Sequence, residues 1–232
     1  MPQTINYDEE ELYNFYNSYI ELYIMRDIVD DYGIVNTENF RKFLRSCAAF
    51  SGRLINYTDI AQASNISSVT AKEWVNILQN MGIVYLLEPY YNNELKKLVK
   101  TPKMYFLDTG FCAFLSSWTS KDTLLNGAEA GHYFENYIIS EIIKRTKAES
   151  KKINLNYYRD TNQNEIDLVL EYDGIITPYE IKLTSKPDKK MLKNFHLLKS
   201  SRVEVRGGGV ICMVNQIEYM TNEYIAIPAF SI

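Results

Sequence analysis

The sequence has no run of about 18 apolar residues, the length that a membrane-crossing helix requires. It is nevertheless 46% hydrophobic over 232 residues, enough to build a buried core. Residues 1–10 also lack the basic start and the apolar stretch of a secretory signal peptide. We therefore expect a cytoplasmic protein without a membrane partner.

Cysteine and histidine are scarce. The three cysteines, Cys47, Cys112 and Cys212, are odd in number and far apart, so they fit neither a disulfide framework nor a zinc spacing. They indicate reduced thiols. The two histidines, His132 and His196, are too isolated to suggest a metal cluster.

A phosphate-binding glycine loop is missing as well. The chain has no G-x-x-x-x-G-K-[ST], and its one glycine run, at residues 207–209, is followed by Val210. We therefore expect no ATP site and no ATPase activity from this chain alone.

Positive charge is nearly absent from the start of the chain. Residues 1–38 carry nine acids and Arg26, a balance of −8, which leaves +4 for residues 39–232. A surface that binds nucleic acid would therefore lie beyond residue 38. Apolar residues at helical spacing between Tyr13 and Ile28 predict an acidic amphipathic helix, which would pack on the next module or on a module missing from this chain.

The most informative stretch is NEIDLVLEYDGIITPYEIK, at residues 164–182. Asp173-Gly174 between two apolar runs predicts a two-residue hairpin, because both turn residues tolerate positive φ. In that register Asp167 lies opposite Glu180, with Cβ atoms roughly 4.5–5.5 Å apart. Two carboxylates at that range repel each other, and a hard divalent cation would turn the repulsion into chelation.

Lys182 has two interpretations. It lies two residues beyond Glu180, on the same side of the strand, where its ammonium could orient a water or stabilise a developing negative charge. The same register also sets Lys182 opposite Glu165, where it would form an ordinary cross-strand ion pair.

A third carboxylate, Glu135, lies in the segment HYFENYIISEIIKR, which has the periodicity of a helix. Glu135 shares a row with Ile139 and Ile142, and acids seldom face a core without a partner. Alternatively, Glu135 benefits only from the helix macrodipole in the first turns.

Taken together, Glu135, Asp167, Glu180 and Lys182 resemble the PD-(D/E)xK nuclease signature. Other blocks, in order along nearly the whole chain, are similar to the C-terminal region of prokaryotic AAA-type ATPases with a domain-of-unknown-function 4143 tail. These blocks are SYIELYIMRDI, FRKFLRSCAAFSGRLINYTDIA, ISSVTAKEWVNILQNMGIVYLLEPYYNN, KTPKMYFLDTGF, GHYFENYIISEI and YYRDTNQNEIDLVL.

The resemblance implies an ATPase module followed by a winged helix and a nuclease-like domain. Because this chain lacks the Walker motif, it would be either a fragment or a form without its ATPase half. Glu135, Asp167 and Glu180 would then hold Mg²⁺, and Lys182 would complete the catalytic set.

We expect an α/β (α+β) fold of three parts: an acidic helical segment at 1–38, a winged helix at 39–118 and a restriction-endonuclease-like mixed sheet flanked by helices at 119–232. The winged helix would use helices at 40–50, 57–62 (capped by Thr58) and 67–80, then strands at 83–87 and 103–107. The last part would contain strands at 155–159, 209–214 and 224–227 and a helix at 189–199.

The third helix of the winged helix would be its recognition helix. Its buried row is Ala71, Trp74 or Val75, and Leu78, which leaves Lys72 and Asn76 on the outer face. Three lysines between the two wing strands would contact DNA phosphates: Lys96, Lys97 and Lys100. Winged helices also serve as docking platforms for proteins. The two alternatives for the partner of this module are therefore DNA and another protein.

Two function classes remain at this point. The first is a magnesium-dependent phosphodiesterase that uses the acidic site. The second is a non-catalytic module that binds DNA or a partner, in which the nuclease fold serves as a scaffold.

Overall fold

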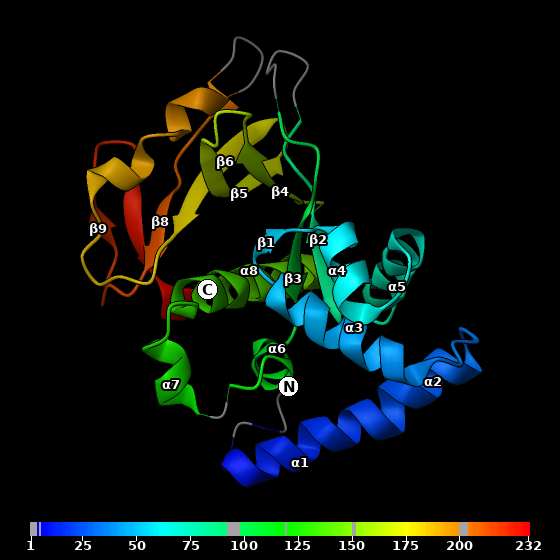
Figure 1. The fold of residues 1–232 in the computed structure, drawn as a ribbon. Helices are drawn as coiled ribbons and strands as arrows, with labels where there is room; N and C mark the ends of the chain where they lie inside the picture. Colours follow the sequence, from blue (N-terminus) through cyan, green and yellow to red (C-terminus); the bar gives the residue numbers. More distant parts are fainter. Residues whose placement is uncertain (1–3, 5, 92–97, 119, 150–151, 200–203) are drawn as a thin grey trace.

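The computed structural model describes residues 4, 6–91, 98–118, 120–149, 152–199 and 204–232 (Figure 1). In these ranges the chain forms eight α-helices, a three-stranded sheet and a mixed seven-stranded sheet. The α/β class expected from the sequence is therefore confirmed. None of the helices in the described ranges offers an apolar stretch long enough to cross a bilayer.

The leading segment is helical from residue 9 to residue 30, as its periodicity predicts. It comprises α1 (Glu9–Tyr19), a π-helical turn (Ile20–Ile24) and α2 (Met25–Asp30). Asp8 and Glu11 form a reciprocal capping box at its start. One face packs into the N-terminal core through Tyr16, Ile20, Ile24, Met25 and Ile28.

Three further helices carry most of the N-terminal core. They are α3 (Thr37–Ala49), α4 (Tyr57–Ser64) and α5 (Ser68–Asn80), and the side chain of Ser67 caps α5. The expectation that Thr58 caps α4 is wrong. The side chain of Asn56 takes that place, because its oxygen accepts from the backbone N–H groups of Thr58 and Asp59.

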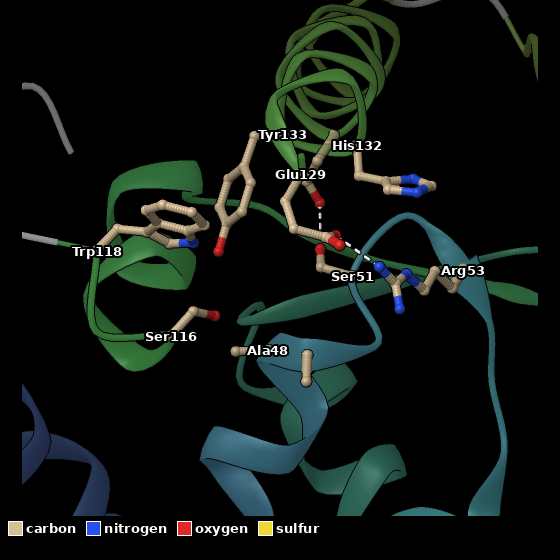
Figure 2. A pocket seen from close by; sticks show the side chains of 10 residues that line it. Ala48, Ser51, Arg53, Ser116, Trp118, Glu129, His132 and Tyr133 are labelled. Carbon is tan, nitrogen blue, oxygen red and sulfur yellow. Dashed lines mark hydrogen bonds and ion pairs between the residues drawn. The ribbon is translucent and has the colours of Figure 1, made fainter. Parts of the chain in front are cut away.

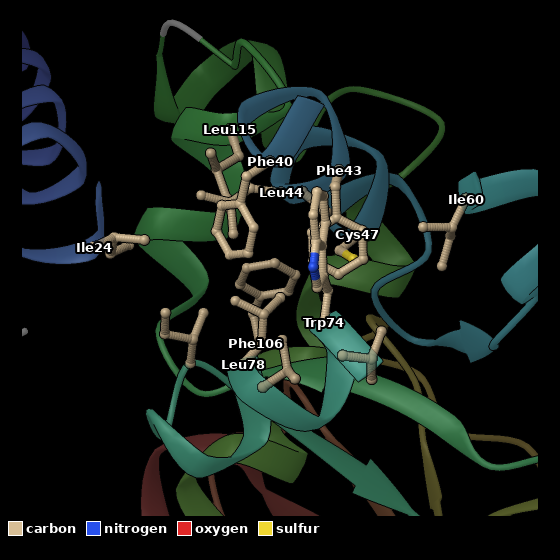
Figure 3. Close-up of a cluster of buried hydrophobic side chains, with 14 of the residues drawn as sticks. Ile24, Phe40, Phe43, Leu44, Cys47, Ile60, Trp74, Leu78, Phe106 and Leu115 are labelled. Carbon is tan, nitrogen blue, oxygen red and sulfur yellow. The ribbon is translucent and has the colours of Figure 1, made fainter. Parts of the chain in front are cut away.

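Aromatic rings fill the centre of this core (Figure 3). The Trp74 ring lies 5.1 Å from that of Phe40 and 5.3 Å from that of Phe43. Ala71, Trp74, Val75 and Leu78 of α5 are all buried, as the helical spacing predicts.

The small sheet follows α5. It contains β1 (Arg53–Leu54), β2 (Val84–Leu87) and β3 (Lys103–Phe106), all antiparallel and in the order β1-β3-β2. Two short helices, α6 (Thr109–Leu115) and α7 (Lys121–Leu125), then lead to α8 (Ala130–Ala148).

The large sheet has the order β4-β5-β6-β8-β10-β9, with β7 beside β6. Strands β4, β5 and β6 are antiparallel, whereas β8 runs parallel to both β6 and β10. The strands are β4 (Asn154–Arg159), β5 (Glu165–Tyr172), β6 (Ile175–Ile181), β7 (Glu204–Val205), β8 (Gly209–Cys212), β9 (Glu218–Tyr219) and β10 (Ile225–Pro228).

Two details of this part differ from the sequence-based expectation. The helix expected at 189–199 is two 3₁₀ turns, Lys189–Leu192 and Phe195–Leu198. Asn194, which lies between them, donates from its side chain to the backbone oxygen of Glu165, and this anchors the break. The short strands β7 and β9 were not foreseen.

Helix α8 lies between the two sheets (Figure 1). Ile138, Ile139 and Ile143 pack on residues of β4, β5, β6 and β8 and on Tyr105 of β3. The other face of the large sheet holds a separate cluster that includes Phe195 and Leu198. Helix α8 therefore joins the N-terminal and C-terminal parts of the chain, together with backbone pairing of Glu88, Tyr90 and Val99 with β4.

Candidate functional site

The β5–β6 hairpin has the predicted turn and register. Asp173 and Gly174 have φ of 52° and 75°, and Tyr172 pairs with Ile175. The ladder continues to Leu168 and Tyr179 and ends there. One step further, the backbone N–H of Ile181 donates to Oδ2 of Asp167, at 2.8 Å. The two strands therefore part where the predicted acids lie.

A β-bulge explains this parting. On β4, Asn156 pairs with Val169 and Tyr158 pairs with Ile166, so Asp167 and Leu168 together face Tyr157 alone. Such a bulge redirects side chains and is common next to active sites. Here it frees the carboxylate of Asp167 to bond to the neighbouring strand.

Lys182 joins the two opposed acids. Its Nζ lies 2.7 Å from Oδ2 of Asp167 and 2.8 Å from Oε2 of Glu180. Both acids are 5% exposed. The alternative pairing of Lys182 with Glu165 is wrong, because the bulge ends the register that it assumed and Glu165 binds other cations.

Glu135 points from α8 into the same region. Its Oε1 accepts from Nζ of Lys103 at 3.0 Å and from the hydroxyl of Tyr105 at 2.6 Å. Both partners belong to β3 of the N-terminal part. The side chain of Glu135 is therefore fixed by contacts between the two parts of the chain rather than by the helix end alone.

Lys103 is the residue that sequence reasoning missed. It is 3% exposed, and its Nζ also lies 2.5 Å from Oε1 of Glu165 on β5. The second oxygen of Glu165 lies 2.7 Å from Nη1 of Arg159. The sequence signal that could have revealed Lys103 is its position in the short apolar strand KMYF. A lysine in such a strand is rarely buried unless it is paired with an acid.

The pKa values of Glu180 and Asp167 shift in opposite directions. Burial, and then the negative charge of Asp167, raise the pKa of Glu180 to about 8. Burial also acts to raise the pKa of Asp167, but Lys182, Lys103 and the N–H of Ile181 outweigh it, so this pKa falls below its usual value. Near neutral pH, Asp167 is therefore the ionised member and Glu180 holds a proton.

Burial and neighbouring charges also shift the pKa values of Glu135 and Lys103. Burial raises the pKa of Glu135 even though Lys103 and Tyr105 act in the opposite direction. Burial acts to lower the pKa of Lys103, but Tyr105 and the surrounding acids raise it well above its usual value. Lys103 is therefore a permanent cation.

The carboxylate oxygens of the site suit Mg²⁺. Asp167 and Glu180 offer hard oxygens that already share one cation, and Mg²⁺ commonly binds through one or two carboxylates plus waters and substrate phosphates. These two residues fit such an ion. Within the described ranges, no three histidine, cysteine or acidic side chains form a group that could hold a metal. Glu135 as a third ligand therefore stays a prediction.

The predicted nucleic-acid residues lie elsewhere. Lys72 and Asn76 are exposed on α5, and Lys100 is exposed just before β3. Lys96 and Lys97 lie outside the described residues.

A cavity of about 220 Å³ lies at the N-terminal end of α8 (Figure 2). Its walls come from the end of α3 and the segment that leads into β1, the segment after α6 and the start of α8, and include Ser51, Arg53, Trp118 and Tyr133. Arg53 and Glu129 form an ion pair at its rim. The cavity includes none of the clustered acids, so it is separate from the candidate site.

Comparisons with known proteins give relatives without a described function. The chain is 24% identical over 171 residues to "Uncharacterized protein Rv2008c" of Mycobacterium tuberculosis and to "Uncharacterized protein Mb2031c" of Mycobacterium bovis. Each match covers 74% of this chain and 38% of the relative. The chain therefore spans well under half the length of these relatives.

Two family models match. A domain of unknown function, DUF4143, matches residues 130–231, which include α8 and the large sheet. Another domain of unknown function, DUF8612, matches residues 1–122, more than half of the sequence, so the chain belongs to the DUF8612 family and carries a DUF4143 domain after it.

Proposed function

We propose that the carboxylate cluster is a magnesium-dependent phosphodiesterase site of the PD-(D/E)xK type, in a protein that acts on nucleic acid. One observation carries the proposal: Asp167 and Glu180, both nearly buried, converge on Lys182 at the point where β5 and β6 part. The side chain of Lys182 is 39% exposed, so this edge of the cluster is open to solvent.

Charge supports the proposal. Glu135, Glu165, Asp167 and Glu180 lie among three cations, Lys103, Lys182 and Arg159. Four acids against three cations leave one excess negative charge, and at neutral pH the proton on Glu180 neutralises it. A divalent cation that replaced this proton would be favoured by the same excess charge.

Each residue has a role in this proposal. Asp167 and Glu180 would hold Mg²⁺, and a bound Mg²⁺ supplies a water of lowered pKa and a Lewis acid for the phosphate. The ammonium of Lys182 would swing from the two carboxylates toward the phosphate and stabilise the developing negative charge. The backbone N–H of Ile181 keeps Asp167 in place through its hydrogen bond.

The N-terminal part would deliver the nucleic acid. Helices α3, α4 and α5, followed by the antiparallel β2–β3 pair with β1 beside it, have the element order of a winged helix. The exposed Lys72 and Asn76 on α5 would face DNA, and Lys100 would contact a phosphate. Each match covers 38% of the relative, which leaves room there for a further module, and the ATPase module that the sequence resemblance implies is our proposal for it.

The test is a calorimetric titration of Mg²⁺ and Mn²⁺ into the chain and into its Asp167→Asn variant, followed by nuclease assays on single-stranded and duplex DNA. Asp173→Asn is the matched control, because it makes the same chemical change in the exposed turn of the same hairpin. We expect metal binding and cleavage in the parent and the control, and neither in Asp167→Asn. Equal metal affinity in all three proteins would refute the site.

A second function has its own support. Within the described ranges, every buried polar side-chain atom has a hydrogen-bond partner, so the cluster is already satisfied without a metal. On this alternative the acids form a structural network and the chain is a non-catalytic module that binds DNA or a partner. It predicts no metal binding in the parent and a large loss of stability in Asp167→Asn.

A further inference from the structure

The cluster divides into two pairs of acids, each joined by one lysine. Asp167 and Glu180 share Lys182, at 2.7 and 2.8 Å. Glu135 and Glu165 share Lys103, at 3.0 and 2.5 Å. Each ammonium lies where two carboxylate oxygens converge, which is also where a divalent cation would bind.

The two lysines differ in their freedom to leave. The side chain of Lys182 is 39% exposed, so it can turn into solvent when a metal enters. The side chain of Lys103 is 4% exposed. Its Nζ lies 5.6 Å from the centre of the Tyr157 ring, and it starts from a strand in which every residue is buried. To leave, Lys103 would have to cross the packed core as an unpaired charge.

The partners of Lys103 are fixed too. The hydroxyl of Tyr105 holds Oε1 of Glu135 at 2.6 Å, and Arg159 holds the second oxygen of Glu165 at 2.7 Å. Neither carboxylate can therefore turn toward Lys182 without losing a bond. The Glu135 half stays filled by the protein's own cation.

We infer that Lys103, contributed by the DUF8612 part of the chain, is a fixed internal cation that limits the carboxylate cluster of the DUF4143 part to a single divalent metal ion, at Asp167 and Glu180. The inference rests on the proposed phosphodiesterase site. It favours a one-metal mechanism over the two-metal clamp of many phosphoryl-transfer enzymes. Lys103 is a positioning residue and does not touch the substrate.

The experiment counts Mn²⁺ ions bound per chain by electron paramagnetic resonance. The proteins are the parent, Asp167→Asn, Lys103→Ala and the control Lys144→Met, which removes an exposed lysine of α8. We expect one ion in the parent and in the control and none in Asp167→Asn. Lys103→Ala, which removes the ammonium and leaves space, should bind two.

Lys103→Met covers the case in which Lys103→Ala does not fold, because it removes the charge and keeps the length. It leaves no space for a second ion, so we expect one ion bound several-fold more tightly than in the parent. A purely structural role for Lys103 would weaken binding instead.

Each outcome decides between the two proposals. Two ions in the parent, or unchanged count and affinity in both Lys103 variants, would overturn the inference and leave the proposed function standing. No ion in the parent but one in Lys103→Ala would refute the proposed function and, with it, the single ion at Asp167 and Glu180; only the exclusion of a metal from the Glu135 half by Lys103 would stand. No ion in any protein would refute both.

Discussion

The raised pKa of Glu180 predicts an unusual pH dependence of stability. Its pKa is about 8 in the folded protein and near its usual 4.5 in the unfolded chain. Between these values the folded state binds one more proton than the unfolded state. The stabilisation is therefore fully present below about pH 4.5 and is lost as the pH rises through 8.

The magnitude follows from linkage. One extra proton changes the free energy of unfolding by about 1.4 kcal/mol per pH unit. From pH 5.5 to 7.5, Glu180 alone should lower the free energy of unfolding by about 2–3 kcal/mol. Asp167 has a lowered pKa, so its contribution is lost only as the pH falls through more acidic values.

Glu180→Gln tests this directly, because glutamine resembles the protonated acid in shape and in hydrogen bonding. Urea unfolding of the parent and the variant would be compared at pH 5.5, 6.5 and 7.5, without divalent ions. We expect the variant to lose most of the slope and to be the more stable protein at pH 7.5. Glu135, whose pKa is also raised, would account for a residual slope of the same sign. Parallel curves for the two proteins would refute the assignment of the proton to Glu180.

Three further predictions concern other parts of the chain. Changing Lys96 and Lys97 together to Glu should weaken retention on duplex DNA and reduce its salt dependence; unchanged retention would remove the DNA-binding role of this segment. Asn136→Ala should lower the free energy of unfolding by about 2–4 kcal/mol in urea titrations. The reason is that the side-chain amide of Asn136 accepts from the backbone N–H of Phe106 and donates to its carbonyl oxygen. A loss under 1 kcal/mol would contradict this. Gly209→Ala should lower the free energy of unfolding by about 4 kcal/mol or more, because the new Cβ would lie 1.7 Å from the backbone oxygen of Ile225. The control Gly131→Ala in α8 meets open space and should be neutral or slightly stabilising. Equal effects of the two changes would refute the steric argument.

Local signals predicted the hairpin and the helix well. Asp173-Gly174 determines the turn through its own φ preferences, and this turn then sets the register as far as Leu168 and Tyr179. The apolar row of α8 gave its extent to within three residues at each end. These features depend on neighbours in the sequence, so one sequence suffices to predict them.

Long-range features could not be predicted in the same way. The bulge at Asp167 depends on pairing with β4, and strict alternation along β5 gives no sign of it. The contact of Lys103 with Glu135 spans 32 residues and joins two parts of the chain. Lys182 was therefore placed opposite Glu165 in one interpretation, whereas the structure gives Glu165 to Lys103 and Arg159.

The contacts of Lys103 mean that the two family units cannot be treated as independent. Removing residues 1–122 would strip both Lys103 and Tyr105 from Glu135 and would leave a carboxylate in an apolar setting that burial already penalises. Such a carboxylate would take up a proton or be exposed to water. The charge of the site, and with it any affinity for a metal, is therefore set partly by a strand of the N-terminal unit. If DNA binding by the N-terminal unit shifted β3, the contacts of Lys103 and Tyr105 with Glu135 would change directly, because both residues belong to that strand.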